Sequence, residues 1–236
     1  MSASTGRYLI PIVTGLGITV AGLVPMVLLG QVNARARPDL PWAAILILVY
    51  YAVLVAWLSG AGPPRRTADQ RRRRLRLWPP QPEERATTEG VPAMAIVALL
   101  AILTVAWVMV GRMSPIPDLS AYPTTAYRWS MFLMGGLAAG LVEEVAFRGY
   151  MQTGIERHDP NNAVWITSLV FAGSHLVKGL GALPLLPGFF IASLLYGTLA
   201  RRTGTIIPGI LIHTLGDLAY MYFGVLRGDS SLLFVR

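Results

Sequence analysis

The chain of 236 residues contains no cysteine. This absence excludes a disulfide scaffold, a thiolate zinc site, an iron–sulfur cluster and a cysteine nucleophile, although it leaves the redox compartment undetermined. Charge is also scarce, because Asp, Glu, Lys and Arg together make up 14% of the residues, against about 25% in a typical soluble domain. The composition therefore argues against a soluble globular domain and against a disordered chain, which would be rich in charge.

Apolar residues take the place of the missing charge, with 54% of the chain hydrophobic and a mean hydropathy of +0.54. A bilayer span needs about 20 mostly apolar residues, and four uncharged runs qualify: 8–30, 40–58, 91–110 and 179–200. Three further apolar runs contain ionisable residues: 129–150, 160–177 and 203–226. We therefore predict an all-α, polytopic membrane protein of about seven transmembrane helices. The first run could instead be a signal peptide, but it exceeds the usual apolar core of about 7–15 residues, which favours a retained anchor.

Eight of the 20 basic residues, and half of the net charge of +8, lie in one segment, 59–90, between the second and third predicted spans. Its arginines are Arg65, Arg66, Arg71, Arg72, Arg73, Arg74, Arg76 and Arg85. We expect a cytoplasmic loop that buries no core, obeys the positive-inside rule and attracts anionic lipid headgroups near residues 65–76. Since the segment has no aromatic residue beyond Trp78, we expect no nucleic-acid partner.

This loop divides the chain into two N-terminal helices (1–58) and a five-helix part (91–236). With the loop inside, the N-terminus also lies inside, and the expected location is the cytoplasmic membrane of a bacterium.

Six ionisable residues lie within the three interrupted runs, where each costs several kcal/mol unless it is paired or hydrated. Glu144 and Arg148 are four residues apart in the order that suits an ion pair on one helix face. Glu143 points about 100° away from Glu144 on an α-helix, so it needs a different partner. The other three members of the set are His175, His213 and Asp217, of which the last two are also four residues apart.

The depths of Glu143, His175 and His213 agree with a shared site. Counted from the inner ends of their runs, all three lie roughly 18–21 Å into the membrane. A Glu and a His that converge on one water form a general-base pair, and a second His can stabilise an oxyanion. Two alternatives stay open: a zinc site, although no helix carries H-E-x-x-H, and a proton relay in a transporter.

Three motifs in this part of the chain resemble those of a known family. Glu143-Glu144-x-x-x-Arg148 resembles an E-E-x-x-x-R motif, Phe171-x-x-x-His175 an F-x-x-x-H motif, and His213-x-x-x-Asp217 an H-x-x-x-N/D motif. Their order and spacing match the CAAX prenyl protease and bacteriocin-processing family, also called CPBP or Abi. The resemblance covers about residues 127–223, and residues 1–126 match nothing beyond generic spans.

The resemblance implies an intramembrane endopeptidase of the glutamate type that needs no metal cofactor, with a membrane-embedded or membrane-associated peptide as substrate. By analogy, Glu143 and His175 would activate water, and His213 with Asp217 would form the oxyanion hole. Many members have Asn at the position of Asp217, so Asp217 would act either as a protonated donor or as an anion that orients His213.

The other two charged residues of the first motif, Glu144 and Arg148, would support their helix. The alternative function is a non-proteolytic immunity or accessory protein that binds a peptide or a partner, and a transporter is third.

Overall fold

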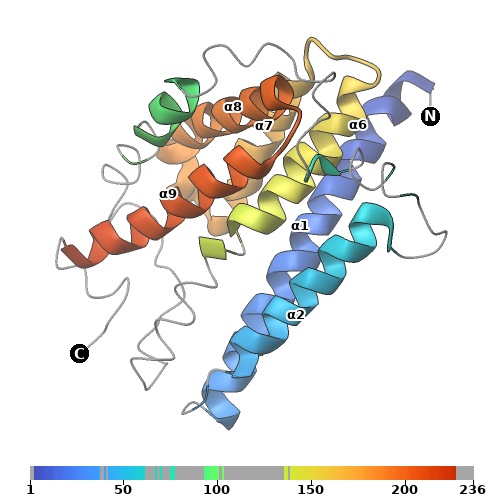
Figure 1. Cartoon of the computed structure of the whole chain (residues 1–236). Coiled ribbons are helices and arrows are strands. Elements are labelled where there is room, and N and C mark those ends of the chain that lie inside the picture. Colours follow the sequence, from blue (N-terminus) through green and yellow to red (C-terminus); the bar gives the residue numbers. More distant parts are fainter. Residues whose placement is uncertain are drawn as a thin grey trace.

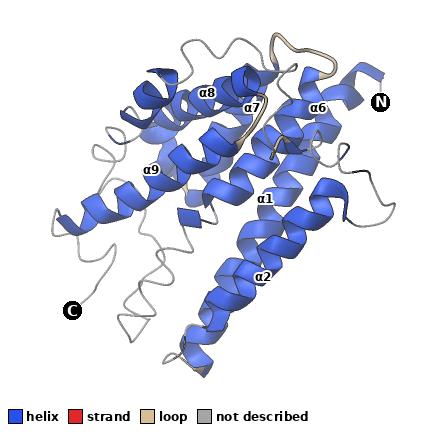
Figure 2. Cartoon of the chain, viewed as in Figure 1, coloured by secondary structure: helices blue, strands red, loops and turns tan. Residues whose placement is uncertain are grey.

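The computed structural model describes residues 3–37, 40, 42–61, 67, 70, 75–77, 93–100, 103, 136, 137 and 139–226. Within these residues every regular element is a helix and no strand occurs, as Figure 2 shows. The prediction of an all-α fold is therefore confirmed, and the chain is a polytopic membrane protein.

The described helices form two groups, which lie side by side in Figure 1. The N-terminal group comprises α1 (Ala3–Ala36), α2 (Trp42–Ala56) and η1 (Trp57–Ala61). The C-terminal group comprises η4 (Ala139–Glu143), η5 (Val145–Gln152), α6 (Thr153–Glu156), α7 (Ala163–Ser174), η6 (His175–Lys178), η7 (Leu180–Leu185), α8 (Leu186–Thr203) and α9 (Ile207–Leu226). Since η4, η5 and α6 follow one another without a break, we call the run 139–156 the motif helix.

Three helices among the described residues are long and apolar enough to cross a membrane, judged by length and composition: Gly6–Asn33, Trp42–Gly60 and Ala182–Thr203. Two shorter apolar helices span Ala163–Val177 and Ile207–Ala219. The predicted span 91–110 is helical at 93–100 and 103, and its other residues lie outside the described part. The start of the predicted span 129–150 also lies outside, and its helix continues beyond the predicted end to Glu156.

The predicted span 179–200 differs most from the structure at its beginning. Gly179 has a φ of 97°, a short 3₁₀ stretch follows at Leu180–Leu185, and the α-helix begins at Leu186. Proline fixes its own φ and lacks a backbone donor, so it favours the first turn of a helix over its interior. Pro184 lies in the 3₁₀ stretch and a second proline stands in the first turn of α8, which explains the late start.

A single polar side chain stabilises the turn between α1 and α2. Asn33 is fully buried, and its amide group donates to the carbonyls of Arg37 (2.7 Å) and Leu40 (2.8 Å) while its oxygen accepts from the amide of Ala43 (2.8 Å). Because a buried backbone group without a partner is costly, this one side chain stabilises the tight return of the chain. The helix α1 also packs along the motif helix.

The arginine-rich segment contradicts the prediction that it buries no core. Leu75 is fully buried and belongs to the main hydrophobic cluster, with Phe147 and Met151. Gly149 allows this contact, because a Cβ there would lie 3.2 Å from the Leu75 carbonyl oxygen. The prediction failed because it averaged over the composition of the segment, whereas a single leucine among the arginines is enough to anchor it.

The neighbouring Arg76 fastens the same segment to two other elements. Its guanidinium forms an ion pair with Glu156 at the end of the motif helix, and its carbonyl accepts from the amide of Ile206 (2.8 Å) at the start of α9. Arg76 adopts a φ of 52°, a left-handed conformation that is uncommon for residues other than glycine. The ion pair and the hydrogen bond hold Arg76 in this conformation.

Other loops meet at the same end of the molecule. The hydroxyl of Tyr8 donates to Asp159 (3.0 Å), and Arg201 donates to the carbonyl of Pro160 (2.7 Å). Hydrogen bonds from the Asn162 side chain are the main reason why the pKa of Asp159 lies below its usual value, and the Tyr8 hydroxyl adds to the effect. The N-terminal part of α1, the arginine-rich segment and the 157–162 loop therefore gather at one end.

Candidate active site

The motif helix carries a polar face within an otherwise apolar protein. Four of its residues recur at intervals of four: Glu144, Arg148, Gln152 and Glu156. The first three are fully buried. Its hydrogen-bonding pattern is largely of the π type, and such wide turns are frequent at functional sites.

Glu144 and Arg148 form the ion pair that their spacing suggests. Arg148 Nη1 donates to Glu144 Oε1 at 2.9 Å, and both side chains are completely shielded from solvent. Arg148 Nη2 donates to Ser193 on α8, to the hydroxyl at 2.7 Å and the carbonyl at 3.2 Å. Gly209 on α9 leaves room for the carboxylate, because a Cβ there would lie 2.6 Å from Glu144 Oε2.

Both glutamates of the motif reach the same imidazole, that of His213 on α9. Glu144 Oε1 lies 3.0 Å from His213 Nδ1, and Glu143 Oε2 lies 3.7 Å from His213 Nε2. Asp217, one turn further along α9, also faces Nε2, with Oδ2 at 3.6 Å. The partner that Glu143 lacks within its own helix is thus His213.

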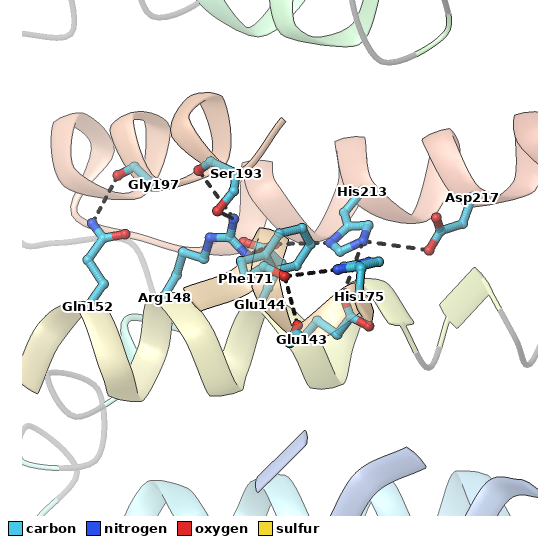
Figure 3. A network of polar contacts seen from close by, with 11 residues as sticks. Glu143, Glu144, Arg148, Gln152, Phe171, His175, Ser193, Gly197, His213 and Asp217 are labelled. Carbon is cyan, nitrogen blue, oxygen red and sulfur yellow. Dashed lines mark hydrogen bonds and ion pairs between the residues drawn. The ribbon is translucent and has the colours of Figure 1, made fainter. Parts of the chain in front are cut away.

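These contacts determine the proton positions on His213. Glu144 Oε1 accepts from Arg148 Nη1, and a carboxylate oxygen in such a pair can only accept a hydrogen bond. His213 Nδ1 therefore carries a proton and donates it to Glu144. The other ring nitrogen, Nε2, points toward Glu143 and Asp217 (Figure 3). Glu144, not Asp217, is the residue that holds His213 through Nδ1.

His175 lies directly after the last residue of α7. Its Nδ1 lies 2.9 Å from the carbonyl of Phe171, and a carbonyl can only accept, so Nδ1 is the protonated nitrogen of the neutral ring. The neutral ring then has its lone pair on Nε2. The residue is 7% exposed, and its ring stacks on Phe189 of α8, with ring centroids 3.8 Å apart.

Phe171 connects the two histidines. Its ring centroid lies 4.8 Å from that of His175 and 5.9 Å from that of His213. In Figure 3 both imidazoles and the Glu143 side chain point into the same region between the motif helix and α9. The common depth of these three residues in the membrane stays a prediction.

The site is closed at one end and open at the other. Glu144 and Arg148 are fully shielded, the Glu143 side chain is 13% exposed, and that of Asp217 is 35% exposed. Ionisable groups are thus arranged along a gradient from a sealed interior to an accessible edge, and a ligand would reach Glu143 and Asp217 from that edge.

A metal site was the alternative for these residues. The part of the chain that the structure describes contains no group of three or more His, Cys, Asp or Glu residues arranged to hold a metal ion. His213 Nδ1 donates its proton to a carboxylate and is thus not available as a ligand, whereas Nε2, Glu143 and Asp217 are chemically competent donors.

Sequence reasoning missed the residues that α8 contributes. Ser193 binds Arg148, Tyr196 stacks on His213 with centroids 4.9 Å apart, and Phe189 stacks on His175. None of them belongs to a motif. The only available signal was their spacing, since positions separated by four and then three residues lie on one helix face.

Comparison with known proteins is informative for one part of the chain. Residues 125–219, about two-fifths of the chain, match the family model described as type II CAAX prenyl endopeptidase Rce1-like. This range coincides closely with the resemblance at about 127–223 and contains all three motifs. No curated protein and no solved structure matches the chain. The part of the chain that carries Glu143, His175, His213 and Asp217 is therefore similar to the type II CAAX prenyl endopeptidase Rce1-like family.

Proposed function

We propose that the protein is an intramembrane endopeptidase that hydrolyses a peptide bond of a membrane-associated protein or peptide. The family match of residues 125–219 supports this class of activity. The single observation that carries the proposal is the convergence of two carboxylates on His213 Nε2, with Glu143 at 3.7 Å and Asp217 at 3.6 Å. Both are at the accessible edge, where a substrate carbonyl and a water could enter.

Glu143 is the proposed general base, assisted by His175. Arg148 pairs with Glu144 and not with Glu143, so the Glu143 carboxylate keeps its capacity to accept a proton. In the neutral His175 ring the lone pair lies on Nε2, which provides a second acceptor for the same water. A positioned general base accelerates such a step by about 10²–10⁴-fold.

The proposed reaction needs no covalent intermediate. Glu143 takes a proton from water, and the resulting hydroxide oxygen bonds to the carbonyl carbon and produces a tetrahedral oxyanion. The carbon–nitrogen bond then breaks, and the proton moves to the departing amine nitrogen. The products are a carboxylic acid and an amine, as in any amide hydrolysis.

His213 is the proposed oxyanion donor, and Glu144 explains how it is positioned. Since Nδ1–H already donates to Glu144, Nε2 can donate to an oxyanion only in the doubly protonated ring. The three nearby carboxylates, Glu143, Glu144 and Asp217, compensate the positive charge of that form. Asp217 either donates from a neutral carboxyl or acts as part of this negative charge.

We further propose that the reaction is independent of metal ions. His213 Nδ1 is used by Glu144, and a glutamate–histidine pair is sufficient to activate water. The zinc hypothesis makes the opposite claim for Glu143, His175 and His213. Treatment with a strong chelator, followed by elemental analysis, distinguishes the two.

The proposed topology has the N-terminus in the cytoplasm. Support comes from the gathering of the arginine-rich segment, the N-terminal part of α1 and the 157–162 loop at one end, because basic loops favour the cytoplasmic side. Anionic headgroups in that leaflet are the proposed partners of the arginines near 65–76.

The test compares membrane proteomes of cells that carry wild-type protein or Glu143→Gln. New peptide termini should appear only with the wild type. Asp159→Asn, which changes an acidic residue in a peripheral loop, is the matched control and should give the wild-type pattern. If the physiological effect survives in both Glu143→Gln and His175→Ala, the protein is an immunity or accessory protein instead.

A further inference from the structure

We infer that α8 is a fourth element of the active site, and that Ser193 and Tyr196 are positioning residues for His213. This inference rests on the proposed function and deepens it. Phe189, Ser193 and Tyr196 are separated by four and three residues, so they share one face of α8. Each of them contacts a different ionisable residue of the site, as Figure 3 shows for Ser193.

Ser193 acts through Arg148. The serine is fully buried, and its hydroxyl and carbonyl oxygens both accept from Arg148 Nη2. The other terminal nitrogen, Nη1, donates to Glu144. A guanidinium is planar and rigid, so fixing Nη2 on α8 also fixes the direction in which Nη1 meets Glu144.

Glu144 transmits this alignment to His213. A single oxygen, Oε1, accepts from Arg148 Nη1 at 2.9 Å and from His213 Nδ1 at 3.0 Å. A shift of the guanidinium therefore moves the acceptor that holds the imidazole proton. The line of contacts runs from Ser193 through Arg148 and Glu144 to His213, and each link is a hydrogen bond with a charged partner, which is a strong class of bond.

Tyr196 holds the plane of the same imidazole. The two rings are nearly parallel, with 14° between their planes and 4.9 Å between their centroids. The Tyr196 ring also faces the guanidinium of Arg148, whose Cζ lies 5.1 Å from the ring centroid. Tyr196 thus contacts both Arg148 and His213, the two ends of the Arg148–Glu144–His213 line. Its stacking on the imidazole determines where His213 Nε2 points.

Ser193 and Tyr196 could instead serve only to fill the core. A spectroscopic measurement on His213 distinguishes that role from the positioning role. The ¹⁵N signals of the His213 ring report the protonation and hydrogen bonding of each nitrogen separately. We expect a sharp signal of a protonated, hydrogen-bonded Nδ1 in the wild type. In Tyr196→Leu and Ser193→Ala we expect this Nδ1 signal to shift or to broaden by exchange, because the ring loses its fixed orientation.

The kinetic arm uses the same variants. Misplacement of a reacting group by about 1 Å can cost about 100-fold in rate, so we expect kcat to fall by about 10–100-fold with KM little changed. Tyr196→Phe keeps the ring and should restore the wild-type ¹⁵N spectrum and rate. Ser168→Ala is the matched control, because Ser168 on α7 is also buried but has no hydrogen-bond partner among the described residues.

The ¹⁵N measurement and the kinetic measurement test separate claims. Unchanged His213 ¹⁵N shifts in folded Tyr196→Leu and Ser193→Ala overturn the positioning role, whether or not the protein is a protease. Absence of peptidase activity in the wild type overturns the proposed function alone, because the ¹⁵N measurement needs no substrate. If Tyr196→Leu does not fold, the positioning role is tested by comparing the His213 ¹⁵N shifts of Ser193→Ala with those of Ser168→Ala. Equal effects of these two substitutions overturn the inference.

Discussion

The buried pair Glu144–Arg148 should show strong energetic coupling in a double-mutant cycle. The proposed variants are Glu144→Gln, Arg148→Met and the double substitution, which keep the approximate size of each side chain. Both side chains are fully shielded and their closest atoms are 2.9 Å apart. Each single change leaves one buried charge without its partner, and such a loss costs about 3–5 kcal/mol.

The structure also defines what the double variant should retain. Gln at position 144 still offers an oxygen to His213 Nδ1–H, and the Ser193 hydroxyl can rotate when the guanidinium is gone. Because no unpaired charge is left, the loss in the double variant should be smaller than the sum of the two single losses. For residues in contact, coupling energies of about 0.5–3 kcal/mol are usual, and we expect a value at the upper end.

Thermal unfolding in detergent measures the three variants against the wild type. A change of 1 kcal/mol shifts the Tm of a chain of this size by about 2–4 °C, so each single variant should unfold on the order of 10 °C lower. Arg201→Met is the control, since Arg201 is exposed and its one hydrogen-bond partner among the described residues is the carbonyl of Pro160. Strictly additive losses in the double variant would refute the interaction.

Four further predictions concern chemistry and pH. Glu143→Gln and His175→Ala should each lower turnover by about 10²–10⁴-fold while the protein still inserts and folds; full turnover in either variant contradicts the mechanism. Activity should survive a strong chelator, and one equivalent of zinc in the purified protein would favour the metal hypothesis. Asp217→Asn should retain activity at neutral pH if Asp217 is a neutral donor, and a rate that is low at every pH would show that its charge is needed. Asn162→Ala should raise the pKa of Asp159 toward its usual value; in a scan of Tm against pH the variant should unfold at a lower temperature than the wild type above about pH 4, and the difference should disappear as the pH falls further and Asp159 is protonated in both proteins.

The all-α fold was predictable because hydropathy is a one-dimensional property of the chain. Long uncharged runs have the length that a helix needs to cross a membrane. The ionisable residues within three of the runs are easily recognised among their apolar neighbours. The spacing of four residues also predicted which side chains share a face, as for Glu144 and Arg148. Periodicity on one helix is local information, and the sequence contains it directly.

What the sequence did not reveal is how neighbouring helices meet. Glu144 was expected only to support its helix, yet it also holds His213 on α9. The contacts of Ser193 and Tyr196 depend on the packing of α8 against α7 and α9, which no local pattern encodes. The buried Leu75 was missed for a similar reason, because its partner Gly149 is more than seventy residues away in the sequence.

The polar face of the motif helix explains why these distant contacts matter together. Within a membrane protein, a buried polar group must find partners inside the fold, and this face provides most of them, although Glu144 Oε2, Arg148 Nε and Gln152 Oε1 have no hydrogen-bond partner among the described residues. Gln152 donates to Glu156 (2.9 Å) and to the carbonyl of Gly197 on α8 (3.0 Å), and Glu156 pairs with Arg76. The arginine-rich segment therefore contacts one end of the face whose other end holds His213. Since α8 accepts hydrogen bonds from this face at two levels, displacement of either the segment or α8 would leave buried polar groups unpaired near the candidate active site.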